Sequence, residues 1–235
     1  MSYKPKTWIK GSFKKIDKIT ELTWIFTIEL EDKFEYKAGQ FVNIKVNGVT
    51  RSYSIASYDS GKNTFELLIV KLEGGALTTM LFGEVKEGDS LEAKGPYGHF
   101  LLPDEIDNDL FFICTGTGLA PFRSMLDLII QKNLSHRKIY LIFGTRTKQD
   151  LLCYDEINDM KNSVEGLVYV PVLSREEWDG ATGYVHKHYK KIISDEDLKD
   201  PIFYLCGWRD MILESRNNLK ELGYDTKKII CEIYD

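Results

Sequence analysis

The feature of this 235-residue chain that most restricts its fold is a change of residue pattern near position 103. Before that point, short runs rich in Ile, Val, Tyr, Phe and Thr alternate with turn residues such as Asn47-Gly48 and Glu87-Gly88-Asp89. These runs predict strands over residues 23–30, 41–46, 51–57, 65–71 and 90–95. So many short strands in so little chain predict a small antiparallel β-barrel, closed so that no strand edge is exposed.

Beyond the acidic stretch 104–109, which is typical of a hinge or linker, apolar strands alternate with helical segments. We predict strands at 110–114, 139–144, 167–173, 202–206 and 228–234, and helices at 121–132, 151–161 and 211–222. This alternation indicates a doubly wound α/β domain around a five-stranded parallel sheet. The sequence therefore predicts two domains, residues 1–103 and 104–235. Ligands bind at the carboxyl ends of the strands in such sheets, so residues 114–118, 144–146, 174–175 and 206–207 are candidate binding positions.

Composition and charge exclude several kinds of protein. The 31 basic and 36 acidic residues give a net charge of −5, which argues against general nucleic-acid binding. The longest apolar runs have about five residues, against ~18 for a membrane span, so no membrane insertion is expected. Lys4, Lys6 and Lys10 interrupt any signal peptide, and a soluble cytoplasmic protein is expected. No CxxC pair occurs, and His186 and His188 do not share a helix face, so no metal site is expected.

Charge is also unevenly distributed along the chain. The acidic excess lies in the second half, whereas a basic stretch runs from Lys4 to Lys18 at the start of the first. A solvated face explains such a stretch, and a docking surface for an acidic partner is the alternative.

A glycine-rich turn follows the first strand of the α/β half. Thr115-Gly116-Thr117-Gly118 leads into Pro121, which suits the first turn of a helix. Glycines allow a tight turn close to a ligand, and the free N–H groups at a helix start attract phosphate. The turn departs from the dinucleotide fingerprint G-x-G-x-x-G because Pro121 stands at the third glycine position. Taken alone, it is equally well read as an ordinary tight turn.

Two further motifs lie in the barrel half. Arg51-Ser52-Tyr53-Ser54 lies on a predicted strand, where alternation puts Arg51 and Tyr53 on one face. A guanidinium can clamp a pyrophosphate and a tyrosine ring can pack on a flat cofactor, although ordinary surface side chains explain the pattern too. The loop at 73–78 enters a short helix with Thr78 as its candidate cap, and offers a second anion site.

Taken in order, these motifs resemble those of the ferredoxin–NADP⁺ reductase family. The chain carries R-x-Y-S at 51–54, G-G-x-x-T at 74–78, G-P-x-G at 95–98, T-G-T-G-x-x-P at 115–121 and C-G at 206–207. The resemblance covers essentially the whole chain. It implies an FAD-binding β-barrel followed by an NADP(H)-binding α/β domain, in agreement with the division read from the residue pattern.

The resemblance also implies roles for individual residues. Arg51 would hold the FAD pyrophosphate, Tyr53 would pack beside the flavin, and Ser54 would hydrogen-bond near flavin N5. Tyr234 would cover the isoalloxazine and move aside for nicotinamide, while Glu232 would assist hydride or proton movement and Cys206 would lie beside the nicotinamide. The expected catalytic residues are therefore Ser54, Cys206, Glu232 and Tyr234. The expected cofactor-binding residues are Arg51, Ser52, Tyr53, Ser54, Gly74, Gly75, Ala76, Leu77, Thr78, Thr115, Gly116, Thr117, Gly118, Pro121, Arg146, Ser174, Arg175, Cys206, Gly207 and Tyr234.

The choice between NADP and NAD depends on groups for the 2′-phosphate. Ser174-Arg175-Glu176 is similar to the S-R-E of NADP-dependent members, and Arg146 ends the preceding predicted strand. The third arginine of some bacterial members is replaced, at the matching position, by Tyr184. Asp235 extends the chain one residue beyond the aromatic that ends plastid-type members. NADPH is expected in preference to NADH.

The activity implied is that of a ferredoxin (or flavodoxin)–NADP⁺ reductase. NADPH would deliver hydride to the flavin, and electrons would pass singly to a small acidic carrier, or the reverse. One alternative is a stand-alone NADH-dependent reductase of the oxygenase type, or a free flavin reductase. Another is a non-catalytic electron-transfer subunit of a larger complex.

Overall fold

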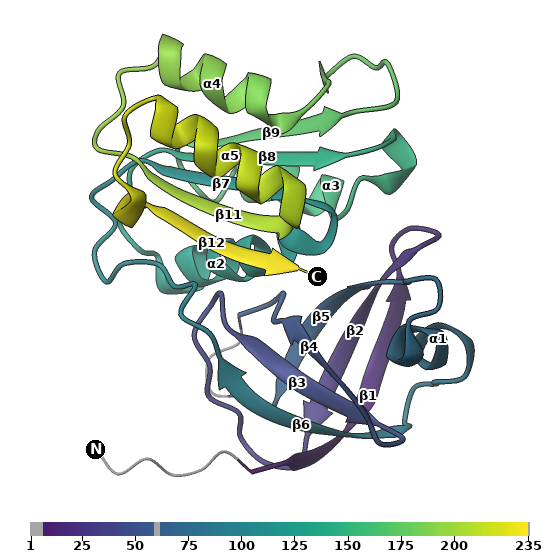
Figure 1. The fold of residues 1–235 in the computed structure, drawn as a ribbon. Coiled ribbons are helices and arrows are strands. Elements are labelled where there is room, and N and C mark those ends of the chain that lie inside the picture. The colour runs from purple at the N-terminus through teal and green to yellow at the C-terminus, as the bar shows by residue number, and fades with distance from the viewer. Residues whose placement is uncertain (1–6, 59–61, 235) are drawn as a thin grey trace.

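The computed structural model describes residues 7–58 and 62–234, which form two bodies side by side, each built on its own sheet (Figure 1). Lys4, Lys6, residues 59–61 and Asp235 lie outside the described residues.

The first body is an antiparallel sheet of six strands in the order β4-β3-β6-β1-β2-β5. Its core is apolar and aromatic, with Phe13, Phe26 and Phe65 almost fully buried. Each side chain of this kind contributes roughly 1.5–3 kcal/mol on burial. Its elements are β1 (Ile9–Lys18), β2 (Thr23–Leu30), β3 (Phe41–Val46), β4 (Val49–Ser54), β5 (Thr64–Val70), β6 (Ser90–Tyr97) and α1 (Ala76–Gly83).

The predicted strands at 23–30 and 41–46 are confirmed at both ends, and those at 65–71 and 90–95 within two residues. The predicted strand at 51–57 starts and ends earlier, as β4. No strand was predicted over β1. A bulge between Phe13 and Lys15 shifts the pairing with β2, so the residues of β1 do not alternate regularly between apolar and polar.

The predicted antiparallel β-barrel is confirmed, but its closure between β4 and β5 is only partial. β4 and β5 end the strand order, and among the described residues a single bridge joins them, from Ile55, just after β4, to Leu67, in the middle of β5. The two strands therefore diverge beyond that bridge, and the edge of β4 is left without a ladder partner. This gap lies on the side of the barrel that faces the second body (Figure 1).

The second body is a parallel sheet in the order β10-β9-β8-β7-β11-β12. The predicted five-stranded core is present as β7 (Leu110–Thr115), β8 (Ile139–Thr145), β9 (Leu167–Leu173), β11 (Ile202–Trp208) and β12 (Ile229–Tyr234). A sixth strand, β10 (Ala181–Thr182), adds two residues to the edge. Short 3₁₀ turns lie at Gly116–Leu119 (η1), Lys148–Asp150 (η2) and Thr226–Lys228 (η3).

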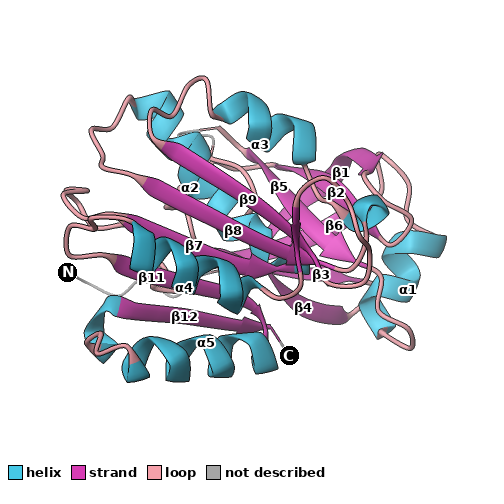
Figure 2. Ribbon diagram, turned by 90° about the horizontal axis from the view of Figure 1, so that it is seen from above, coloured by secondary structure: helices cyan, strands magenta, loops and turns pink. Residues whose placement is uncertain are grey.

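Helices cover both faces of this sheet (Figure 2). α2 (Ala120–Lys132) and α3 (Tyr154–Met160) pack on one face, and α4 (Val185–Asp195) and α5 (Arg209–Glu221) on the other. β7 serves both cores, because Phe112 faces α2 while Phe111 and Ile113 face the opposite cluster. The sequence analysis missed α4, although Val185, Tyr189 and Ile192 have helical spacing. Among the described residues, no helix is long and apolar enough to cross a membrane.

The acidic stretch 104–109 is tied down at its end. Asp109 is 1% exposed, accepts the N–H of Lys199 at 2.6 Å and pairs with Arg137 at 3.3 Å. Ile106 is buried in the core under α2. A domain boundary at 103/104 stays a prediction, with the chain anchored to the second body soon after it.

Candidate functional site

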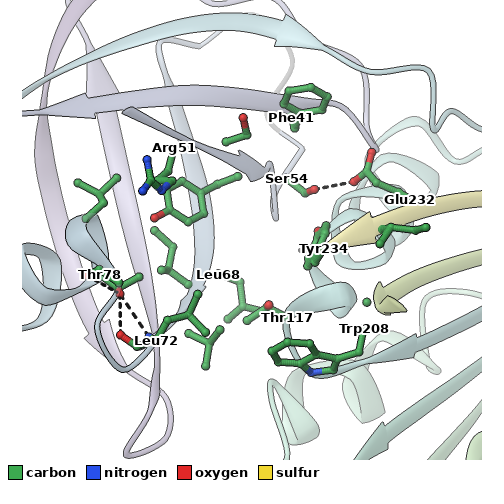
Figure 3. Close-up of a pocket in the computed structure, with 18 of the residues that line it drawn as sticks. Phe41, Arg51, Ser54, Leu68, Leu72, Thr78, Thr117, Trp208, Glu232 and Tyr234 are labelled. Carbon is green, nitrogen blue, oxygen red and sulfur yellow. Dashed lines mark hydrogen bonds between the residues drawn. The ribbon is translucent and has the colours of Figure 1, made fainter. Parts of the chain in front are cut away.

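A cavity of about 550 Å³ lies where the gap between β4 and β5 meets the carboxyl ends of β7, β11 and β12 (Figure 3). Both bodies contribute to its walls. It brings together residues that the sequence analysis predicted from separate motifs, namely Arg51, Ser52, Tyr53, Ser54, Gly75, Ala76, Leu77, Thr78, Thr115, Thr117, Gly207, Glu232 and Tyr234.

β4 forms one wall of the cavity. All four residues of Arg51-Ser52-Tyr53-Ser54 line it, although strand alternation predicted opposite faces, because an edge strand beside a gap presents both. The Arg51 guanidinium is exposed and donates to the Thr50 carbonyl at 2.7 Å. It makes no ion pair with any described residue, so its charge is available to an anion. Burial raises the pKa of Tyr53 to about 12, so its ring is a neutral, largely apolar surface.

The loop leading into α1 forms the next wall. Thr78 is the third residue of the helix and not its cap, which corrects the prediction; Gly75 occupies the cap position. The Thr78 hydroxyl donates to the carbonyl of Leu72 at 3.1 Å and accepts the N–H of Leu72 at 3.3 Å (Figure 3). It therefore fixes the shape of the loop, while the free N–H groups expected at a helix start remain at the cavity wall.

The opposite wall is built where the glycine-rich turn meets the end of β11. A Cβ on Gly118 would lie 2.3 Å from the Cys206 carbonyl oxygen, so only glycine allows this backbone contact. Trp208 follows at the mouth of the cavity and is 54% exposed. Its backbone N–H donates to Thr115 Oγ1 at 3.3 Å. Pro121 lies in the first turn of α2, as predicted.

Ser54 and Glu232 join the two bodies at the floor of the cavity. Ser54 Oγ donates to Glu232 Oε1 at 2.7 Å (Figure 3). Burial raises the pKa of Glu232, against the opposing effect of the Ser54 hydrogen bond. Two residues on, the Tyr234 hydroxyl is buried with no hydrogen-bond partner among the described residues.

Cys206 lies behind this wall and does not line the cavity. It is fully buried and in register with Glu232 on β12. Burial raises the pKa of its thiol well above the ordinary value, so a thiolate role is disfavoured and any contribution is through packing.

Arg146, Ser174 and Arg175 lie outside the cavity, at the ends of the adjacent strands β8 and β9. The Arg175 N–H donates to the Arg146 carbonyl at 2.9 Å, which holds the two arginines side by side. Ser174 Oγ donates to the Thr145 carbonyl at 3.1 Å. Both arginines are exposed, and neither forms an ion pair with a described residue. The Glu176 carboxylate accepts the Lys148 N–H at 2.8 Å and is not paired with them.

Some predicted residues do not line the cavity, and some residues that line it were not predicted. Gly74, Gly116, Gly118 and Pro121 shape the loops without lining the cavity. The sequence analysis missed several lining residues, which are Phe41, Leu68, Ile69, Val70, Leu72, Trp208 and Ile233. Trp208 directly follows Cys206-Gly207, and this strand-end position could have revealed it. The apolar residues carry no such signal, because they read as ordinary core.

The walls together fit a flat ring system joined to a diphosphate, as in the FAD that the sequence resemblance implies. Apolar and aromatic side chains line a slot that suits flat rings, and the Arg51 guanidinium, which has no ion-pair partner among the described residues, can bind an anion. Among the described residues, no group of three His, Cys, Asp or Glu side chains is placed to hold a metal ion.

The described lysines of the basic stretch, Lys10, Lys14, Lys15 and Lys18, lie away from this cavity, on β1, whose neighbours are β6 and β2. Lys14 pairs with Glu29 at 2.7 Å, Lys15 with Asp17 at 2.9 Å and Lys18 with Glu21 at 2.7 Å. Local pairing of this kind favours the solvated-face interpretation.

Comparison with known proteins agrees with this geometry. An oxidoreductase FAD-binding domain family matches residues 10–101, and an oxidoreductase NAD-binding domain family matches residues 112–217. A ferredoxin–NADP reductase B of Sorangium cellulosum is 32% identical, over 86% of this chain and 86% of that protein. A CDP-6-deoxy-L-threo-D-glycero-4-hexulose-3-dehydrase reductase of Yersinia pestis is also 32% identical over 86% of this chain, but the chain spans only 60% of its length.

Solved structures share the fold. A cytochrome P450 reductase of Amycolatopsis, GcoB, superposes with a TM-score of 0.90 and 26% identity, covering 99% of this chain and 71% of that one. The fold of the two bodies is therefore shared with this reductase over almost the whole chain.

Proposed function

This chain belongs to the ferredoxin–NADP⁺ reductase family of FAD- and NAD(P)-binding oxidoreductases, and from that premise we propose that it transfers electrons between NADPH and a small one-electron carrier, ferredoxin or flavodoxin. The observation that carries the proposal is a cavity walled by both bodies. On one side lies Arg51, which has no ion-pair partner among the described residues, and on the other lies the glycine-rich strand–helix turn. Electron exchange between two nucleotide-bearing groups requires such a shared site.

The first body supplies the residues that would hold FAD. Arg51 and the start of α1 would take the pyrophosphate, while Tyr53 and Tyr234 would flank the ring system. When bound, FAD supplies the ability to take up a hydride and release electrons one at a time. The protein's part is to bind, to orient and to exclude water.

Ser54 and Glu232 would hold or transfer a proton at the edge of the flavin ring. Because burial raises the pKa of Glu232, its carboxyl holds a proton more readily than an exposed glutamate does. Its 2.7 Å hydrogen bond from Ser54 would orient both groups toward the cavity. Cys206 would act from behind, by holding the end of β11 against the glycine-rich turn.

The second body would bind the nucleotide substrate. Thr115, Thr117 and the turn up to Pro121 would receive its pyrophosphate, with Gly207 at the nicotinamide end. Tyr234 would occupy the place that the nicotinamide needs, and would have to move for transfer to occur.

Arg146 and Arg175 support NADPH over NADH. The two guanidiniums lie on adjacent strand ends without ion-pair partners among the described residues, and Ser174 directly precedes Arg175. The 2′-phosphate of NADPH would form ion pairs with both guanidiniums.

A second candidate is a reductase component that serves another redox enzyme with NADH. The relatives that are named as reductases of a dehydrase and of a cytochrome P450 favour it, and both are longer than this chain. In that case the carrier would be an iron–sulfur or haem protein, and the two arginines would have no phosphate to bind.

The test is steady-state dye reduction by the purified protein with NADPH and NADH side by side, for wild type, Arg146→Ala and Arg175→Ala. Loss of one charge-assisted contact should raise the KM for NADPH about tenfold or more and leave NADH nearly unchanged. Arg216→Ala, an exposed arginine on α5, is the matched control. Equal losses with both nucleotides would refute the 2′-phosphate role, and a wild type that prefers NADH would support the second candidate.

A further inference from the structure

A second contact between the two bodies lies on the side of α2, away from the cavity. Figure 1 shows α2 on the side of the second sheet that faces the barrel. Four polar side chains of α2, Arg123, Ser124, Asp127 and Gln131, contact the backbone of residues 56–58, which follow β4. We call this set of four contacts the α2 seam.

The contacts of the seam follow one another along the chain. Arg123 Nη1 donates to the Ala56 carbonyl at 2.9 Å, and Ser124 Oγ donates to the Ser57 carbonyl at 2.7 Å. The Tyr58 N–H donates to Asp127 Oδ2 at 3.3 Å, and Gln131 Nε2 donates to the Tyr58 carbonyl. Side chains of one helix therefore satisfy the backbone groups of three successive residues in the other body.

Arg123 is the centre of the seam. It is 9% exposed, and its guanidinium bonds Glu66 of the barrel at 2.6 Å and Glu156 of α3 at 2.8–3.0 Å. Burial lowers the pKa of Arg123, but the hydrogen bond to Glu156 and the charge of Glu66 outweigh it, so the pKa is raised and the cation persists. The Arg123 side chain thus bonds to three parts of the chain at once, namely β5, α3 and the segment that follows β4.

The residues of the α2 seam are close in sequence to both walls of the cavity. Residues 56–58 begin two positions after Ser54, which lines the cavity, and α2 directly follows the η1 turn that carries Thr117. Few residues therefore separate either side of the seam from the cavity. The seam and the Ser54–Glu232 hydrogen bond are separate attachments, and two separate attachments restrict rotation of one body against the other.

We propose that Arg123 is a positioning residue, which sets the distance and angle between the nucleotide turn at 115–121 and the flavin strand β4 through the α2 seam. This inference rests on the proposed function and deepens it. Since a misplacement of about 1 Å can cost about a hundredfold in rate, the seam should control the rate of transfer more than the affinity for either nucleotide.

The experiment compares single-turnover reduction of the FAD-loaded protein by NADPH in wild type, Arg123→Met, Arg123→Lys and Glu66→Gln. We expect Arg123→Met to lower the limiting rate of flavin bleaching about tenfold or more, with half-saturation by NADPH changed less than about threefold. Lysine cannot make the bidentate bond to Glu156 together with the other contacts, so Arg123→Lys should restore only part of the rate. Glu66→Gln, which keeps the arginine, should show a smaller loss in the same direction if Arg123→Met does not fold.

Hydrogen exchange supplies a readout that does not depend on activity. The Tyr58 amide, which donates into the seam, should exchange faster in the Arg123 variants than in wild type. Lys132→Met, at the exposed end of α2, is the matched control and should alter neither rate nor exchange.

Two results would overturn the inference in different ways. A limiting rate equal to that of Lys132→Met, with only the melting temperature lowered, would reduce Arg123 to a stabilising residue. Failure of wild type itself to be reduced by either nucleotide would instead overturn the proposed function, and the positioning role with it.

Discussion

At the scale of single residues, the site consists of side chains that are far apart in the sequence and that the fold brings together. Ser54 and Glu232 are far apart in the chain yet 2.7 Å apart in space. Their motifs could be recognised in sequence, because R-x-Y-S and the terminal E-x-Y are local patterns. Their contact could not, because it depends on how the two bodies pack. The prediction of Thr78 as the N-cap of α1 was wrong for a local reason. The Thr78 hydroxyl bonds back to Leu72, and Gly75 occupies the N-cap position.

Arg51 provides the first test at this scale. Arg51→Ala should yield protein with little bound FAD, because removal of a bidentate guanidinium from a diphosphate costs about 1.5–3 kcal/mol or more. The measurement is the ratio of flavin absorbance to protein absorbance after purification, with Arg216→Ala as control. Full FAD occupancy in Arg51→Ala would remove this residue from the pyrophosphate site.

Gly118 provides the second. Gly118→Ala should lower the free energy of unfolding by about 1–3 kcal/mol, because the new methyl group would meet the Cys206 carbonyl oxygen at 2.3 Å. Gly83→Ala is the matched control, since a Cβ there meets nothing within 4 Å. Urea unfolding of both variants is the measurement, and equal stabilities would mean that the turn can shift at little cost.

At the scale of elements, the sequence predicted the strands best where one pattern held along the whole element. β9 was predicted residue for residue, and so were β2 and β3, since each is rich in apolar residues and is bounded by polar or turn residues. β1 was missed because its bulge breaks the alternation, and α4 because charged residues surround its apolar positions. The opening between β4 and β5 was beyond prediction, because barrel closure depends on pairing between strands far apart in the chain.

α2 gives a prediction that depends on pH. Burial raises the pKa of Asp127 from an ordinary 3.8 to about 6, despite the nearby Arg123 and the Tyr58 N–H and with Glu156 and Glu66 adding to the rise. A raised carboxyl pKa favours the folded state when the group is protonated; that contribution is present below the unfolded pKa and is lost as pH rises through about 6. Asp127→Asn should therefore match wild type near pH 3.8 and be the more stable protein at pH 8.

The expected gain at pH 8 is about 1 kcal/mol, after allowance for the partial exposure of the carboxyl. Thermal unfolding across pH 4–8 would measure it, with the exposed Asp159→Asn as control. A difference between Asp127→Asn and wild type that does not change with pH would contradict the titration of Asp127 in this range.

At the scale of the whole molecule, the chain consists of two half-sites that meet at one cavity, and its surface charge must accommodate a carrier. The described lysines of β1 are largely paired with carboxylates and lie away from the cavity. If an acidic carrier docks on basic residues, residues nearer the cavity are better placed than the lysines of β1.

Salt dependence tests whether a charged surface guides the carrier. Reduction of a purified [2Fe–2S] ferredoxin should fall about tenfold between roughly 0.05 and 0.5 M salt, while reduction of a neutral quinone changes little. The Lys14→Gln and Lys18→Gln variants should keep the wild-type slope, because those side chains are already paired. Similar slopes for ferredoxin and quinone would argue against electrostatic docking.

The uncovered edge of β4 has a consequence for how the protein is made in a cell. A strand edge without partners is a template for pairing between chains, and here the place beside it is the one assigned to FAD. A bound molecule would both shield that edge and stabilise the fold by mass action. The yield of soluble protein should therefore follow the supply of riboflavin during synthesis, and chains that emerge faster than flavin is available should be lost to aggregation or proteolysis.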